Sequence, residues 1–338
     1  MNDKLRVGVI GAGRIGRIHA QTLVQAIPQA ELVTVADIAL ESAQACALDL
    51  GVPRAVKDIA DVLNDESVQA VVIASATDMH AEQIILAAQA GKHIFCEKPI
   101  AASLEQIDAA LDAVEQAGVK LMVGFNRRFD PNHQRIKRAL DEGEIGTPHM
   151  MHIVSRDPAP PPLEYVRVSG GMFFDMTIHD FDMARFLLGE VDEVYASANV
   201  LVDPAIGSAG DVDTAVIVLK FANGAIGTID NSRQAVYGYD QRVEVFGSGG
   251  SVASGNLHPD QVTVSTDQYI RRGLPLNFFM ERYLTSYRVE MAEFVRCVLR
   301  DTPPPVTGVD GRLPVVMAQA ALRSYQENRP VRLSEVGG

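Results

Sequence analysis

A glycine-rich turn near the start of the chain constrains its fold more than any other feature. A short apolar run at 5–10 leads into Gly11, Gly13 and Gly16, which are spaced as G-x-G-x-x-G, and a helix-like segment follows to about residue 26. Between a strand and a helix this spacing predicts a dinucleotide-binding turn, because Gly11 permits the tight turn and Gly13 lets a pyrophosphate approach the backbone. Gly16 lets the helix pack closely on the strand, and the exposed amides at the helix start can hold the phosphates.

An acidic residue follows the second strand-like run, 31–36. Asp37 follows the glycine motif at about the sequence separation that is typical of an acidic residue that binds the adenosine ribose hydroxyls. A carboxylate there repels a 2′-phosphate, and Ile38 follows it where an arginine could have accepted one. The sequence therefore favours NAD over NADP. The alternative for Asp37 is a solvated turn residue.

Strand-like and helix-like segments keep alternating up to about residue 124. The run at 68–74 is almost continuously apolar, as in a buried parallel strand, and a helix-like segment at 80–90 follows it. This alternation predicts a doubly wound parallel sheet, so we expect an α/β Rossmann domain over residues 1–124. Ligands of such sheets bind at the carboxyl ends of the strands. Further strands are expected at 92–96 and 121–125, and a further helix at 104–116.

The tripeptide Glu97-Lys98-Pro99 follows one of these strands. A lysine just past the carboxyl end of a strand lies beside the expected nicotinamide end of the cofactor. Its ammonium can donate to a substrate oxygen, or exchange protons if it is desolvated. Pro99 constrains the backbone of Lys98, and the bond between them is a candidate cis peptide. The alternative for Lys98 is a surface lysine at the end of a strand.

The stretch 170–182 is where the sequence places the chemistry. A glycine-rich loop enters a helix-like segment that continues to Leu188. Residues four apart on a helix share one face, so Asp175 and His179 should point the same way. A carboxylate beside an imidazole can fix the ring tautomer and favour the charged ring, which makes the pair a candidate proton acceptor near neutral pH. The alternative is an ordinary amphipathic helix.

Residues 125–338 follow a different pattern. Strand-like segments with short connections predominate after Pro148, and the stretch 221–225 carries a hairpin-turn signal. We therefore expect an α+β domain with a large, open, mostly antiparallel sheet, closed by helices at about 278–300 and 313–328. One broad sheet face has no obvious helical cover, so we expect a homo-oligomer. The expected strands are 150–157, 193–200, 213–221, 225–232, 242–246 and 261–266.

Composition excludes several classes of protein. The net charge of −13 argues against a general nucleic-acid binder. No run approaches about 18 consecutive apolar residues, so we expect no membrane span. The three cysteines are far apart and odd in number, and the histidines offer no metal-ligand spacing, so we expect neither a disulfide framework nor a bound metal. This cysteine usage and the lack of a signal-peptide core favour the cytoplasm.

Three motifs together give the sequence a family resemblance. The glycine motif at 11–16, Glu97-Lys98-Pro99, and Asp175 with His179 four residues later resemble the glucose–fructose oxidoreductase/inositol dehydrogenase family over essentially the whole chain. Within that family the sequence is similar to the bacterial inositol 2-dehydrogenases. The segments that match best are 126–130, 155–158, 177–182 and 237–242.

The resemblance implies a mechanism and a set of site residues. It implies NAD as the cofactor, oxidation of a polyol, specifically myo-inositol to 2-keto-myo-inositol, and a homotetramer paired through the sheet of the second domain. The catalytic residues are then Lys98, Asp175 and His179. The residues expected to contact the polyol are Lys98, Arg128, Asp157, Asp175, His179 and Tyr237, with Tyr239 possible in place of Tyr237. The residues expected to contact the cofactor are Gly11, Gly13, Arg14, Ile15, Gly16, Asp37, Ser75, Thr77, His80, Glu97 and Lys98.

Three alternatives stay open at this point. The first is the same chemistry on another polyol or sugar, such as scyllo-inositol or an aldose, because relatives act on many such substrates. The second is an oxidoreductase that keeps NADP bound through a sugar-to-sugar exchange. The third is a nicotinamide-binding sensor without turnover, which would not need Lys98, Asp175 and His179 together. The sequence also leaves open whether His179 or Lys98 takes the proton first.

Overall fold

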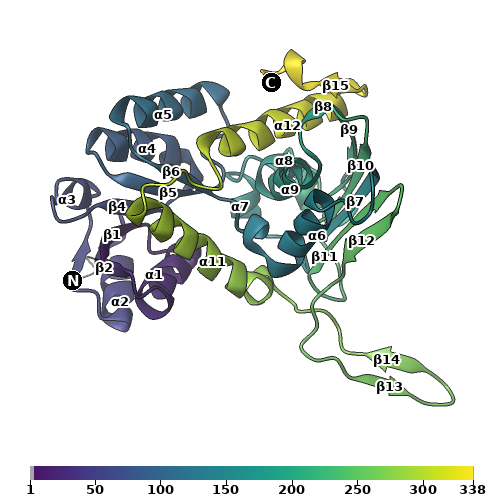
Figure 1. Cartoon of the computed structure of the whole chain (residues 1–338), viewed down its shortest axis with the longest axis horizontal. Helices are drawn as coiled ribbons and strands as arrows, with labels where there is room; N and C mark the ends of the chain where they lie inside the picture. Colours follow the sequence, from purple (N-terminus) through teal and green to yellow (C-terminus); the bar gives the residue numbers. More distant parts are fainter. Residues whose placement is uncertain (1–3, 338) are drawn as a thin grey trace. The chain divides into compact units, whose positions relative to one another are not determined.

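Residues 4–337 are described in the computed structural model, and the chain divides into two compact units (Figure 1). The first unit holds the residues up to Phe129 together with Thr285–Leu313. The second unit holds Asp130–Leu284 and the residues from Pro314 onward. The expected boundary after residue 124 lies close to Phe129, but the segment 285–313, which the sequence assigned to the second domain, groups with the first unit.

The first unit is built on a six-stranded parallel sheet, which confirms the predicted Rossmann topology. In spatial order its strands are β3 (Arg54–Val56), β2 (Ala30–Ala36), β1 (Leu5–Ile10), β4 (Ala70–Ile73), β5 (His93–Glu97) and β6 (Leu121–Gly124). The strand order reverses between β1 and β4, and ligands of such sheets bind outside the carboxyl ends at that reversal. Every residue of β4 is buried, which explains its uninterrupted apolar sequence.

Helices connect the strands of this sheet and supply its covering layers. They are α1 (Arg14–Ala26), α2 (Leu40–Leu50), α3 (Ala60–Leu63), α4 (His80–Gln89) and α5 (Leu104–Ala117), with short 3₁₀ turns η1 (Thr77–Met79) and η2 (Asn126–Phe129). The predicted segments for α1, α4 and α5 agree with these bounds to within one residue. Helices α2 and α5 end at glycines in the left-handed conformation, Gly51 and Gly118, as expected for helix C-termini.

The second unit is built on a seven-stranded sheet. In spatial order its strands are β12 (Gly250–Ser254), β11 (Asp240–Gly247), β7 (Pro148–Arg156), β10 (Ile226–Ser232), β9 (Thr214–Phe221), β8 (Val191–Asn199) and β15 (Val331–Arg332). β7 and β10 pair in parallel, and the remaining neighbours are antiparallel. The predicted large, mostly antiparallel sheet is thus confirmed. The parallel pair brings the carboxyl ends of β7 and β10 to one edge of the sheet.

Helices lie against one face of this sheet, and a hairpin extends from it (Figure 1). The helices within residues 131–208 are α6 (Pro131–Asp141), α7 (Leu163–Val166), α8 (Met172–Asp175), α9 (Ile178–Leu188) and α10 (Pro204–Ser208). The hairpin strands are β13 (Thr263–Ser265) and β14 (Ile270–Arg272), and all their residues are exposed. Side chains on β9 and β11 alternate between buried and exposed, so one face of each strand packs and the other is open. The exposed apolar residues on the open face are Met150, Val216, Val218, Ile226 and Phe246.

Two long helices contribute residues to both units, α11 (Phe279–Leu299) and α12 (Gly308–Glu327), and the 3₁₀ turn η3 (Leu333–Glu335) lies near the end of the chain. The sequence predicted the last helix at about 313–328. The structure starts α12 at Gly308 and encloses Pro314. Thr307 explains the earlier start: its hydroxyl accepts from the Asp310 amide, and the Asp310 carboxylate accepts from the Thr307 amide. No helix within residues 4–337 is long and apolar enough to cross a membrane.

Candidate active site

The glycine turn after β1 has the geometry that its spacing predicts. Gly11 adopts a φ of 98°, a conformation that favours glycine, and a Cβ on Gly16 would lie 1.8 Å from the Gly11 carbonyl oxygen. A Cβ on Gly13, in contrast, would meet no atom within 4 Å. The turn is therefore closed on the side of the sheet and open at Gly13, where the backbone is accessible to a phosphate group.

Asp37 lies beside this turn, partly buried, and its carboxylate has two backbone partners. Its Oδ2 accepts from the Ala12 amide at 2.7 Å, and its Oδ1 accepts from the Ala39 amide at 2.8 Å. These two bonds hold the carboxylate between the glycine turn and the end of β2. Each carboxylate oxygen has a second lone pair, so both can accept a further hydroxyl. An open turn with a fixed carboxylate next to it fits the adenosine half of NAD.

His80 ties together the ends of β4 and β5, where the nicotinamide half of a cofactor is expected. Its buried ring lies between two carbonyl oxygens, with Nδ1 2.8 Å from that of Pro99 and Nε2 3.2 Å from that of Ser75. Burial lowers the pKa of His80, against the opposing effect of these carbonyls. The Lys98–Pro99 bond is cis. His80 thus fixes the turn that carries Lys98, while direct contacts of His80, Ser75 and Thr77 with a cofactor stay predictions.

Glu97 is held from the opposite side by a histidine that the sequence analysis missed. Its Oε1 lies 2.6 Å from Nε2 of His19, a fully buried residue of α1. The His19 ring packs edge-to-face against Phe95 and Tyr287, with centroids 5.0 and 5.7 Å away. Only its place three residues after Gly16, on the same side of α1, could have indicated this role. His19 and His80 together hold both ends of the tripeptide around Lys98.

The helix that was predicted to carry Asp175 and His179 is in fact two helices. Asp175 is the last residue of α8, and His179 lies in the first turn of α9. Between them, the fully buried Thr177 donates its hydroxyl to Asn231 at 2.6 Å, and Asn231 donates its amide to Asp180 at 2.8 Å. These bonds fix the start of α9 to β10 and interrupt the single helix that the sequence suggested. The pair is therefore positioned by the sheet and not by helical spacing alone.

The two oxygens of the Asp175 carboxylate accept hydrogen bonds from different segments. Oδ1 accepts from the Tyr165 hydroxyl at 2.8 Å, and Oδ2 accepts from the Arg233 guanidinium at 3.3 Å. Asp157, just after β7, exchanges backbone bonds with the segment after β10: its amide donates to Ser232, and its carbonyl accepts from Ala235. Asp157 and Arg233 therefore stand at the same edge of the sheet, where β7 and β10 end.

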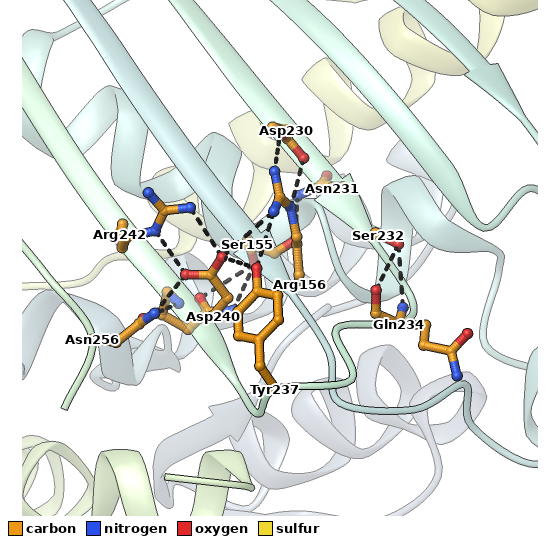
Figure 2. A network of polar contacts seen from close by, with 11 residues as sticks. Ser155, Arg156, Asp230, Asn231, Ser232, Gln234, Tyr237, Asp240, Arg242 and Asn256 are labelled. Carbon is orange, nitrogen blue, oxygen red and sulfur yellow. Dashed lines mark hydrogen bonds and ion pairs between the residues drawn. The ribbon is translucent and has the colours of Figure 1, made fainter. Parts of the chain in front are cut away.

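Tyr237 lies in a separate polar network on the sheet (Figure 2). Its hydroxyl donates to Asp240 at 2.6 Å and accepts from Arg156 at 3.0 Å, and Arg156 pairs with Asp230. Burial, together with the hydrogen bond to Asp240, raises the pKa of the Tyr237 phenol. Burial alone would raise the pKa of Asp240, but hydrogen bonds from Arg242 and Tyr237 hold it below its usual value. The hydroxyl of Tyr237 thus has one acceptor and one donor partner within the protein.

The alternative residue Tyr239 is buried, and its ring lies edge-to-face against Tyr283 with centroids 6.1 Å apart. Arg128, another predicted polyol contact, is buried in η2 and donates to Asp310 at 3.0 Å within the first unit. Burial would raise the pKa of the Asp310 carboxyl, but the charge of Arg128 and the Thr307 bonds hold it low. Both Arg128 and the two tyrosines therefore have structural partners, and their contacts with a substrate stay predictions.

The predicted residues divide between the two units. The glycine turn, Asp37, Ser75, Thr77, His80, Glu97, Lys98 and Arg128 belong to the first unit, and Asp157, Asp175, His179 and Tyr237 belong to the second. Within residues 4–337, no group of three or more histidine, cysteine or acidic side chains is placed to hold a metal ion.

Comparison with known proteins agrees with this division. Residues 5–125 match the oxidoreductase family with an NAD-binding Rossmann fold, and residues 133–253 match the GFO/IDH/MocA C-terminal domain. The chain is 49% identical to the Myo-inositol 2-dehydrogenase of Thermotoga maritima, covering 99% of this chain and 100% of the relative. It is 39% identical to the scyllo-inositol 2-dehydrogenase (NAD(+)) of Bacillus subtilis, covering 98% of this chain and 97% of that protein.

A solved structure extends the likeness to the fold. The myo-inositol dehydrogenase of Lactobacillus casei, crystallised in complex with NAD(H) and myo-inositol, matches with a TM-score of 0.87 and 28% identity. The match covers 97% of this chain and 96% of that one. Both family domains are matched in order, and the relatives cover 97–99% of this chain. The chain therefore belongs to the GFO/IDH/MocA family of oxidoreductases, and its first unit is an NAD-binding Rossmann fold.

Proposed function

We propose that this protein oxidises myo-inositol at its axial secondary hydroxyl to 2-keto-myo-inositol, with NAD as the hydride acceptor. The observation that carries the proposal is the 49% identity, along the full length of both chains, with a protein named Myo-inositol 2-dehydrogenase. The site agrees with the same chemistry, because a lysine, a carboxylate and an imidazole are the groups that oxidation of a secondary alcohol needs.

The cofactor belongs to the first unit in this proposal. The open backbone at Gly13 and the amides of Arg14 and Ile15 at the start of α1 suit its pyrophosphate. Asp37 has lone pairs to spare for the ribose hydroxyls. When bound, the nicotinamide of NAD accepts a hydride from the carbon that carries the reacting hydroxyl. We accordingly assign NAD binding to residues 1–124, and substrate binding and assembly to residues 125–338.

Residues of the chain accept the proton and stabilise the negative charge on the substrate oxygen. Negative charge develops on the substrate oxygen as its proton leaves, and the Lys98 ammonium donates to that oxygen. His179 accepts the proton, and Asp175 orients the imidazole and binds a neighbouring hydroxyl of the polyol. Lys98 is the alternative first acceptor. Arg128, Asp157 and Tyr237 are the further polyol contacts in this proposal, with Tyr239 as an alternative to Tyr237.

A panel of polyols and sugars assayed with NAD and with NADP tests the proposal. We expect NAD reduction to be fastest with myo-inositol, and we expect His179→Ala to lose about 10²–10⁴-fold in kcat without a change in NAD affinity. Wild-type turnover by His179→Ala would remove the imidazole from the mechanism. No reduction of either cofactor by any polyol would favour a sensor, and tightly retained NADP would favour a sugar-to-sugar exchange.

Scyllo-inositol is the second candidate substrate. The observation that favours it is the 39% identity with a protein named scyllo-inositol 2-dehydrogenase (NAD(+)). The two inositols differ only in the orientation of the hydroxyl on the carbon that is oxidised, and both give the same ketone. A kcat/KM higher for scyllo-inositol than for myo-inositol would therefore correct the substrate and leave the mechanism intact.

We also propose that the protein works as a homotetramer in the cytoplasm. The open face of the second sheet presents Val216, Val218 and Phe246, and apolar side chains of this kind are usually covered in an assembly. Burial of Cys46, Cys96 and Cys297 without disulfides suits a reducing compartment. Light scattering of the purified protein measures its mass, and Val218→Glu, which places a charge on the open face, should yield smaller species.

A further inference from the structure

Arg233 stands behind the Asp175 carboxylate and has no role in the mechanism above. It follows β10, and its side chain is 1% exposed. One guanidinium nitrogen, Nη1, donates to Asp175 at 3.3 Å, and the other, Nη2, donates to Asp211 at 3.4 Å. Its backbone amide donates to Asp213 at 2.8 Å, so the main chain next to the guanidinium is fixed as well. A single buried cation therefore joins two carboxylates from different segments.

Asp211 connects this cation to the start of α8. Its Oδ1 accepts from the Met172 amide at 2.9 Å, at the first residue of that helix. A Cβ on Gly171, which has a φ of 89°, would lie 2.9 Å from the same oxygen, so glycine is what allows the carboxylate to approach. Asp211 thus holds the beginning of α8, and Arg233 bridges from Asp211 to Asp175 at its end.

Burial of an arginine at this position is energetically unfavourable compared with an apolar side chain. A buried guanidinium is costly to desolvate, and among residues 4–337 the Nε of Arg233 finds no hydrogen-bond acceptor. A well-packed apolar side chain in place of a buried ion pair is often neutral or stabilising. The two carboxylates also carry more charge than the one cation balances. Stability alone therefore does not explain why a cation is buried at this point.

The need to orient the Asp175 carboxylate explains why a cation is buried here. Arg233 fixes Oδ2 from inside the protein, and the half-exposed Tyr165 donates to Oδ1 from the other side. A bond to each oxygen from a different side sets the plane of the carboxylate. We propose that Arg233 is a positioning residue for the oxidation reaction: it holds Asp175 in the orientation that binds the polyol and aligns His179. This inference rests on the proposed function.

A charge-matched pair of variants separates positioning from charge balance. Arg233→Met leaves Asp175 and Asp211 with no cation between them, and Arg233→Met/Asp211→Asn restores the original net charge without restoring the bond to Asp175. We expect the double variant to recover the melting temperature of the parent to within a few degrees. We expect its kcat/KM for myo-inositol to stay about 10²-fold below the parent, as for a misplaced reacting group, with the Kd for NAD unchanged. Arg233→Lys, which keeps a cation, should recover part of the activity.

One control variant and one structural measurement make each outcome decisive. Arg185→Met removes another arginine of the same unit, paired with Glu190 at the far end of α9, and should leave kcat/KM unchanged. If the double variant regains both stability and kcat/KM, Arg233 only balances charge and the proposal is wrong. A crystal structure of the double variant tests the inference without any substrate: we expect the Asp175 carboxylate to leave its place beside Tyr165, and an unmoved carboxylate would overturn the inference. Failure of the parent to oxidise any polyol would instead count against the proposed function.

Discussion

Replacing Asp37 should weaken NAD binding and narrow the preference for NAD over NADP. The structure fixes this carboxylate with one bond from the Ala12 amide, 2.7 Å away in the glycine turn, and one from the Ala39 amide at 2.8 Å. The remaining lone pairs can accept the adenosine ribose hydroxyls, and the negative charge repels a 2′-phosphate. Asp37→Asn keeps an oxygen for one amide but replaces the other oxygen with a donor and removes the charge.

The size of the effect follows from the bonds that are lost. A hydrogen bond to a charged group contributes about 1.5–3 kcal/mol, and each 1.4 kcal/mol corresponds to about tenfold in Kd. Loss of one charge-assisted ribose bond should therefore raise the Kd for NAD by about 10- to 150-fold. The Kd for NADP should stay constant or fall, because the lost ribose bond is offset by relief of the repulsion with the 2′-phosphate.

Titration calorimetry with NAD and NADP measures both constants directly. Asp58→Asn is a matched control, because Asp58 accepts from the Ala60 amide two residues further on, at 2.9 Å, as Asp37 does from Ala39. The control should bind both cofactors like the parent. A change of less than threefold in the Kd for NAD, or a parent protein that binds NADP as tightly as NAD, would refute the assignment of Asp37 to the ribose.

Two further predictions concern the glycine turn and the stability of the second unit. Gly16→Ala should lower the melting temperature and abolish NAD binding, because its Cβ would lie 1.8 Å from a carbonyl oxygen. Gly13→Ala should melt at the same temperature as the parent and lose only affinity for NAD, because its Cβ would meet no atom within 4 Å. Calorimetry of both variants measures the melting temperature and the Kd for NAD. Asp130→Asn should lower the free energy of unfolding by about 3–5 kcal/mol near neutral pH, because it removes the carboxylate that pairs with the buried Arg282. Burial would raise the pKa of Asp130, but Arg282 and His133 hold it below its ordinary value. This stabilisation is therefore complete above the pKa of about 3.9 in the unfolded chain, and it is lost as the pH falls through the lower pKa of the folded protein. Denaturant titrations should therefore give free energies of unfolding for parent and variant that converge below about pH 4.

The parts of the fold that could be predicted from the sequence are those with local causes. Parallel strands buried on both faces, such as β4, have uninterrupted apolar sequences, and the glycine turn is specified by residues within one short stretch. The start of α12 also had a local signal, the pair Thr307 and Asp310 three residues apart, which the expected start at about 313 did not use. Local signals of this kind were sufficient for both sheets and for the position of Asp37.

The interactions that position the candidate catalytic groups have no local cause. The break between α8 and α9 depends on Thr177 and Asn231, which are 54 residues apart. The tie between His19 and Glu97 joins residues 78 apart. The sequence around each partner does not indicate which distant residue it contacts. Such contacts can be found only once the strands that carry them have been placed.

This separation between local and distant causes has a physical origin in how the site is built. Asp175 ends a helix of one turn, which is too short to hold its own geometry in water. Its carboxylate accepts from Arg233, 58 residues later just after β10, and from Tyr165, while Asp211 in the segment before β9 holds the start of the helix. Because β10 is paired on both edges, Arg233 directly follows a strand that is hydrogen-bonded on both sides. A helix of a single turn can therefore hold a carboxylate in a fixed orientation when a residue beside the sheet supplies the opposite charge.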